Sequence, residues 1–197
     1  MDSSTPARGP RLPFPAGTLD HASAAARHDP QRLVDRVRRV SVWRGALLKN
    51  PTGEIVRYFA VVWDGTEAEH LDVKTDDPAF QTFWEFCTLL LALITWGSFF
   101  TKESVVIYGD NTAALSNALS LKGRGVLLHV AREVAWRQAK RGWNFETAHL
   151  PSEHNAVADA LSRIADPKGK QWPSLALGAA EADSPPRLSE LWLARPV

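Results

Sequence analysis

The sequence predicts an α/β fold, in which a five-stranded mixed sheet that begins with a hairpin is flanked by helices. Two apolar, β-branched stretches flank a turn signal, and strand and helix patterns then alternate as far as residue 165. In addition, 45% of the 197 residues are hydrophobic, which suffices for one domain with a sizeable core. We expect residues 1–30, rich in Pro, Ala, Ser and Arg, to be a disordered tail or linker, and residues 168–197 to be a Pro/Ala-rich tail.

Three strand patterns open the folded part of the chain. Residues 37–50 are apolar and β-branched and end at the turn signal NPTGE. Residues 54–65 follow as the second strand of a hairpin, and residues 67–75 are expected to form a third strand. The sheet is therefore expected to begin with these three strands.

A long apolar helix comes next. Asp76 and Asp77 supply an acidic N-cap, and Pro78 fits the first turn. The stretch AFQTFWEFCTLLLALITWG is the helix itself, and Gly97 is expected to end it. This helix is the strongest apolar element of the sequence.

The second half of the chain alternates strands and helices. Residues 103–111 are expected to form a short, buried strand, and residues 143–150 the fifth strand. Between them lie the short helix TAALSNALS, the basic loop KGRG and the long amphipathic helix VLLHVAREVAWRQAKRG. The last helix is expected at residues 155–165, and LSELWLARP near the C-terminus is expected to form a short docking helix.

Composition narrows the classes of protein. The formal charge is +1 and the isoelectric point about 8.0, so only local basic patches can argue for a nucleic-acid partner. The single cysteine, Cys87, excludes a disulfide framework and a cysteine-based zinc site. The apolar run at residues 86–96 is too short to span a bilayer, and the N-terminus lacks an apolar signal core. We therefore expect a protein of the cytoplasm or nucleus that is neither secreted nor bound to membranes.

Three acidic residues stand out by their positions. Glu85 lies inside the apolar helix, where an acid must face a polar group or carry a large cost. Asp110 ends a strand, the place where α/β proteins put their chemistry, and Asp159 lies in the last helix. If the three carboxylates converge, they would bind a hard divalent cation through oxygen.

Three stretches of the sequence, DPAFQTFWEFCTLLLAL, IYGDN and HLPSEHNAVADALSR, together resemble the ribonuclease H-like domain, most closely the version in retroelement polyproteins. The first is similar to the helix of the family's catalytic Glu, which falls on Glu85. The second is similar to the strand whose Asp binds metal, which falls on Asp110. The third is similar to the family's last motif, which puts its acid on Asp159 and its His and Asn on His149 and Asn155.

The resemblance covers residues 34–167 and implies a ribonuclease H-like fold with a two-metal site. Glu85, Asp110 and Asp159 would hold two Mg²⁺ (or Mn²⁺) ions, which cleave the RNA strand of an RNA–DNA hybrid. His149 would relay protons during product release. The expected partner is an RNA–DNA hybrid or another nucleic acid, and the domain is expected to belong to a larger polyprotein.

The first strand departs from the family pattern. The family's first catalytic Asp precedes a run that corresponds to GALL here, and RRVSVW stands before that run. This alignment puts Arg39, or Arg38 after a one-residue slip, in the position of the Asp, and the nearest acid is Asp35. Very slow or undetectable cleavage is therefore expected, and the alternative function is that of a catalytically inactive nucleic-acid-binding module.

Four residues are expected to contact nucleic acid. Lys122 and Arg124 lie in the loop SLKGRG, and glycine-rich basic loops can follow a phosphate backbone closely. The alternative is that these cations are only solvated residues beside a helix. Asn111 follows the strand that ends at Asp110, and the resemblance makes Asn155 both a contact and the cap of the last helix.

Overall fold

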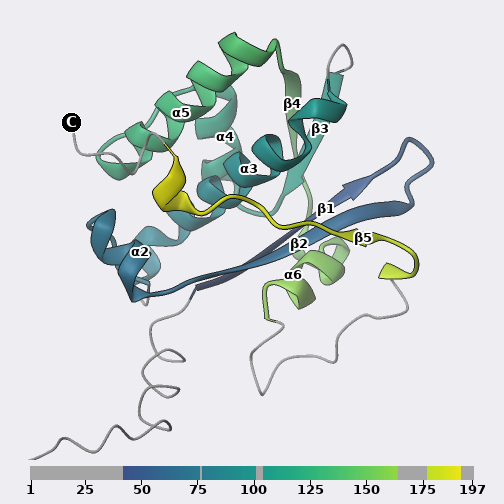
Figure 1. Ribbon diagram of the computed structural model, residues 1–197, viewed down its shortest axis with the longest axis horizontal. Helices are drawn as coiled ribbons and strands as arrows, with labels where there is room; N and C mark the ends of the chain where they lie inside the picture. The colour runs from purple at the N-terminus through teal and green to yellow at the C-terminus, as the bar shows by residue number, and fades with distance from the viewer. Residues whose placement is uncertain (1–41, 76, 101–103, 164–176, 192–197) are drawn as a thin grey trace, which may run out of the picture.

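In the computed structural model, which describes residues 42–75, 77–100, 104–163 and 177–191, the chain has a mixed α/β fold (Figure 1). A three-stranded sheet has the order β1-β2-β5, and a separate two-stranded sheet is formed by β3 and β4. Helix α3 packs on β1, with α4 and α5 on its other side, whereas α6 packs on the hairpin away from α5 (Figure 1). The α/β class expected from the sequence is confirmed.

The hairpin consists of β1 (Val42–Lys49) and β2 (Ile55–Trp63), which pair antiparallel. Asn50 organises the turn, because its side-chain oxygen accepts hydrogen bonds from the backbone N–H groups of Thr52 and Glu54. The predicted hairpin and its turn are therefore confirmed.

The two faces of β1 meet different helices. Ala46 and Leu48 belong to the apolar core, and Val42, two pleats earlier on the same face, is buried. On the opposite face any side chain at Gly45 would collide with Leu161 of α6 (Ala156–Leu161). Glycine at this position therefore lets α6 approach the strand closely.

The expected third strand at residues 67–75 is wrong. The structure has helix α2 (Gly65–His70) there, followed by a turn. Asp64 caps the helix, since its carboxylate accepts hydrogen bonds from the backbone N–H groups of Thr66 and Glu67. A capping Asp before good helix formers outweighs the short apolar alternation that suggested a strand.

Helix α3 (Gln81–Trp96) is the centre of the core. Asp77 caps the short 3₁₀ turn η1 (Pro78–Phe80) before it, and a second turn begins at Gly97, as expected for its end. By length and composition alone, the continuous stretch Pro78–Phe99, which is longer than the apolar run at residues 86–96, could cross a membrane. More than half of its most apolar 18-residue window is buried inside the molecule, as in the core helix of a folded domain.

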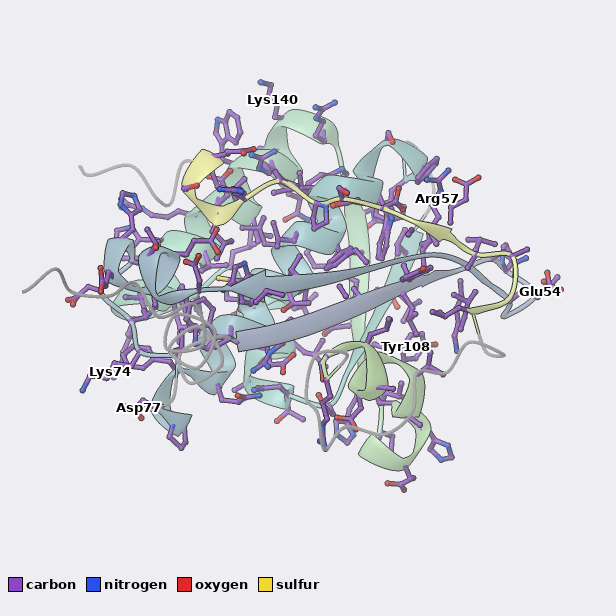
Figure 2. The ribbon with its side chains drawn as sticks, turned by 60° about the horizontal axis from the view of Figure 1, so that its bottom comes forward. Glu54, Arg57, Lys74, Asp77, Tyr108 and Lys140 are labelled. Atoms are coloured by element: carbon purple, nitrogen blue, oxygen red, sulfur yellow. The ribbon has the colours of Figure 1, made fainter. Side chains whose placement is uncertain are left out.

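The second half follows the expected order of β3 (Ser104–Gly109), α4 (Thr112–Ser120), α5 (Val126–Arg141) and β4 (Asn144–His149). β3 and β4 pair in parallel, and Gly109 lies opposite His149. The expectation that β3 is buried is wrong, because Val106 and Tyr108 on one of its faces are 43% and 61% exposed. Tyr108 is labelled in Figure 2. The strand packs through its other face alone, with Val105 and Ile107 against the core.

The single five-stranded sheet that was expected is instead divided in the described residues. β1 pairs with β2 and β3 pairs with β4, but no ladder joins β1 to β3 in the ranges that the structure covers. One reason for the difference is that a strand expected at residues 67–75 is a helix. The segment with Asp35, Arg38 and Arg39 lies outside the described residues.

The described part of the C-terminal segment packs on the sheet. Its strand β5 (Glu181–Ala182) pairs in parallel with β2, and Asp183 accepts a hydrogen bond from the indole of Trp96 at 2.8 Å. The expected docking element is the 3₁₀ turn η4 (Leu188–Glu190), whose Leu188 and the following Leu191 are buried. Residues 177–191 therefore contribute to the core.

Candidate functional site

A polar cluster lies between the first turns of α3 and the core-facing side of β1. The guanidinium Nε of Arg44 lies 3.2 Å from Oε1 of Glu85, and its Nη2 donates to Oε1 of Gln81 at 2.8 Å. Gln81 in turn donates its amide to Oε1 of Glu85 at 3.1 Å. Because Gln81 and Glu85 are one helical turn apart, both face the same guanidinium.

Asp110 lies beside this cluster because of the turn between β3 and α4. Asn111 caps α4, with its side-chain oxygen accepting from the backbone N–H of Ala114 at 3.0 Å. The amide of the same residue donates to the hydroxyl of Thr82 at 3.4 Å. This double role ties the end of β3 to the first turn of α3. Asp110 itself is exposed, yet it lies within electrostatic range of Arg44 and Glu85.

The charges of the cluster oppose one another. Burial raises the pKa of Glu85; the attraction of Arg44 lowers it, the repulsion of Asp110 raises it and the hydrogen bond from Gln81 lowers it. Burial lowers the pKa of Arg44, while both carboxylates raise it. Arg44 therefore supplies a positive charge that attracts both carboxylates and partly offsets their mutual repulsion.

Asp159 belongs to a different interaction. It lies in α6 and forms an ion pair with Arg163, one turn further along, at 2.9 Å. Across the described ranges, no group of three or more His, Cys, Asp or Glu side chains could hold a metal ion. The structure thus brings Glu85 and Asp110 together, but Asp159 is not grouped with them.

Among the described residues, Glu85, Asp110 and Asp159 as they lie here do not fit a two-metal centre. Mg²⁺ demands nearly octahedral coordination by oxygen atoms. The guanidinium of Arg44 occupies the carboxylate of Glu85, so it neutralises negative charge and occupies oxygen atoms that a metal ion would need. Glu85 already interacts with Arg44, and Asp159 with Arg163. The arrangement can hold a fixed cation and its counter-charges, which is a different chemistry from metal-assisted hydrolysis.

His149 and Asn155 belong to the last motif and lie before α6. His149 is exposed at the end of β4. It lies opposite Gly109 of β3, the residue directly before Asp110. Asn155 occupies the N-cap position of α6 but its side chain makes no capping hydrogen bond, which corrects that expectation. Its backbone ψ angle is 17°, because the turn η3 (Ser152–His154) leads directly into the helix, and a capping side chain needs extended backbone.

The basic loop between α4 and α5 presents its cations to solvent. Lys122 and Arg124 are both exposed. Gly123 passes close to the backbone of α5, where a Cβ would lie 2.5 Å from the carbonyl carbon of Leu127. Gly125 adopts a positive φ of 54°, which favours glycine. The glycines therefore have a structural reason, and they leave both cations accessible.

Arg44, like Gln81, is a residue of this cluster that the alignment with the family did not single out. It shares its face of β1 with Val42, Ala46 and Leu48, which pack into the core. An arginine in an alternating, core-facing row must find acidic partners or carry a large cost. That alternation in VWRGALLK is the signal in the sequence that indicates Arg44.

The chain was compared with protein families, curated proteins and solved structures. No protein-family model matches the chain, and no curated protein and no solved structure is significantly similar to it.

Proposed function

We propose that this chain is a ribonuclease H-like module of retroelement type that binds RNA–DNA hybrid and does not cleave it. Support comes from the three motifs in family order and from the proximity of Glu85 and Asp110, two of the three acids of those motifs. The module is proposed to act inside the cell as part of a larger polyprotein.

Arg44 is the observation that carries the proposal. Its guanidinium lies against Glu85 and within range of Asp110, where the family's reaction would need divalent cations. A guanidinium offers only N–H donors and remains protonated, so it cannot ligate a metal ion or accept a proton from a water molecule. The cation that the resemblance implies, Mg²⁺ or Mn²⁺, would have to displace this arginine before it could reach both carboxylates.

Binding of nucleic acid is proposed to use the exposed cations Lys122 and Arg124, with Asn111 and Asn155 as further contacts. A hybrid duplex presents phosphates and 2′-hydroxyl groups in its shallow minor groove, which suit such donors. Because the net charge of the chain is only +1, we expect weak affinity that depends on salt.

A titration of labelled RNA–DNA hybrid tests this proposal, with fluorescence anisotropy for binding and gel electrophoresis for cleavage. We expect binding without cleavage in Mg²⁺, and at most a trace of cleavage in Mn²⁺. The double variant Lys122→Ala/Arg124→Ala should reduce the slope of log affinity against log salt by about one to two.

The matched control is Lys74→Ala, which removes an exposed lysine from another loop and should leave the slope unchanged. An unchanged slope in the double variant would remove the loop from the interface. Absence of hybrid binding at low salt would refute the proposed function, and rapid cleavage that disappears in Asp110→Asn would show that the module is an active nuclease.

A further inference from the structure

We propose that the outer face of α5 is a separate binding surface for single-stranded nucleic acid, on which a base stacks against Trp136. This inference concerns residues away from the Arg44 cluster and does not depend on hybrid binding at that cluster. It comes from the unusual position of one tryptophan among those whose side chains the structure describes.

Trp136 is 52% exposed, whereas the other described tryptophan side chains are buried: Trp63, Trp84, Trp96 and Trp143. Exposure of such a large aromatic ring to water is unfavourable, and exposed tryptophans are typical of surfaces that bind a partner. The apolar contacts that stabilise the fold therefore do not explain this tryptophan.

Two cations lie over the exposed ring and make cation–π contacts with it. The Nζ of Lys140 lies 4.8 Å from the ring centroid of Trp136, and the Cζ of Arg137 lies 5.6 Å from it. Arg137 is positioned by Glu133, whose carboxylate lies 2.7 Å from its Nε and is completely buried. The ring and its cations are thus part of one arrangement rather than of a freely moving surface.

The charge of this helix face is positive. Glu133 is the only acid in α5, and its side chain is buried on the inner side with Val130 and Val134. The basic residues Lys140 and Arg141 are exposed in the last turn. A partner of negative charge is therefore favoured along this face.

The location separates this surface from α6. α5 lies on the side of α3 away from the hairpin, whereas α6 lies on the hairpin itself (Figure 1). Figure 2 shows Lys140 projecting from the edge of the molecule, with α6 on the opposite side. A ligand on α5 would accordingly leave α6 uncovered.

Single-stranded nucleic acid is the partner whose chemistry fits both features. Its phosphates match the cations, and its unpaired bases offer flat faces that stack on an aromatic ring. A duplex has its bases already stacked on one another, and an acidic peptide lacks flat rings at regular spacing. The outer face of α5 therefore fits a single strand better than either.

The test measures binding of a labelled oligo(dT) strand to the full chain by fluorescence anisotropy at low salt. Loss of one stacked base should lower affinity about tenfold in Trp136→Ala, while Trp136→Phe should keep most of it. Lys140→Ala should lower affinity and reduce the salt slope by about one. The control Tyr108→Ala removes another exposed aromatic ring, 61% exposed, and should change nothing.

Several outcomes would overturn the inference: equal affinity of Trp136→Ala and the unmodified chain, equal displacement of the strand by polyglutamate and by unlabelled oligo(dT), or stronger Trp136-dependent binding to phosphatidylserine vesicles. Far-ultraviolet circular dichroism establishes that each variant is folded. The Asp110→Asn variant should bind oligo(dT) normally, so that failure here and failure of hybrid binding remain distinguishable.

Discussion

Arg44 and Arg57 lie on the same face of the β1–β2 hairpin, but their acidic partners come from different parts of the chain. Arg57 contacts Asp183 at 2.9 Å and Glu181 at 2.6 Å, both in the C-terminal segment, and lies over the ring of Phe99. Arg44 contacts Glu85 in α3 and lies within range of Asp110.

The difference separates an arginine that stabilises the fold from an arginine that shifts the pKa of neighbouring carboxylates. The partners of Arg57 hold residues 177–191 on the sheet, because Asp183 bridges Arg57 and Trp96. The partners of Arg44, Glu85 and Asp110, are two of the acids on which the proposed function rests. We therefore expect loss of Arg57 to act on stability, and loss of Arg44 to act on the ionisation of its neighbours.

The largest effect is expected from Arg57→Ala. It removes two ion pairs and leaves the mostly buried carboxylate of Asp183 with the hydrogen bond from the indole N–H of Trp96 among the described contacts of that carboxylate. We expect the free energy of unfolding to fall by about 2 kcal/mol, measured by urea denaturation. Limited proteolysis should then cut residues 177–191 sooner.

The control for that variant is Glu181→Gln, because Glu181 is mostly exposed and its pair with Arg57 should contribute less than about 1 kcal/mol. If Arg57→Ala and Glu181→Gln lose the same small amount, Asp183 does not anchor the C-terminal segment.

A change in pH dependence is expected from Arg44→Met. Burial and Asp110 both raise the pKa of Glu85, and Arg44 opposes them. Removal of Arg44 should raise that pKa further. Because the folded protein then holds a proton that the unfolded chain has lost, the free energy of unfolding should fall over a wider pH range, by about 1.4 kcal/mol per unit of added pKa shift.

Urea denaturation between pH 4 and pH 8 measures that range. Arg163→Met is the matched control, since it removes the arginine of the Asp159 pair, which is largely exposed to solvent and should change stability far less than Arg44→Met does. Identical profiles for Arg44→Met and the unmodified chain would show that Arg44 does not control the ionisation of Glu85.

A smaller effect is expected from Glu85→Gln. The raised pKa of Glu85 means that its contribution to stability is present below its ordinary value of 4.5 and is lost as pH rises through the folded value. Glutamine does not ionise, so the decline above pH 4.5 should be shallower in this variant. An unchanged decline would assign the pH dependence to another group.

Elements of the fold that depend on residues close together in the sequence were predicted more accurately than those that depend on distant segments. The Asn50 turn, the end of α3 at Gly97 and helix α5 follow from short-range chemistry, and all were predicted. α2 was missed because its capping residue Asp64 was assigned to a strand. The division of the sheet depends on pairing between distant segments, which periodicity does not reveal.

The candidate site shows the same limit. Motifs identified Glu85 and Asp110 as neighbours, which follows from their places on a helix and at a strand end. The partner of Asp159 was missed, since Arg163 is an ordinary residue one helical turn away. Arg44 could be recognised only from the alternation of β1, because its partner Glu85 lies in a helix far along the chain.

The most direct test measures binding of Mn²⁺ through the electron paramagnetic resonance signal of the free ion. This measurement examines the site without requiring a substrate. We expect the unmodified chain to leave the free-ion signal unchanged at micromolar Mn²⁺. We also expect Arg44→Asp to bind the ion and Asp110→Asn in that background to abolish the binding. Stoichiometric binding by the unmodified chain that is lost in Asp110→Asn alone would contradict the claim that Arg44 takes the place of the metal.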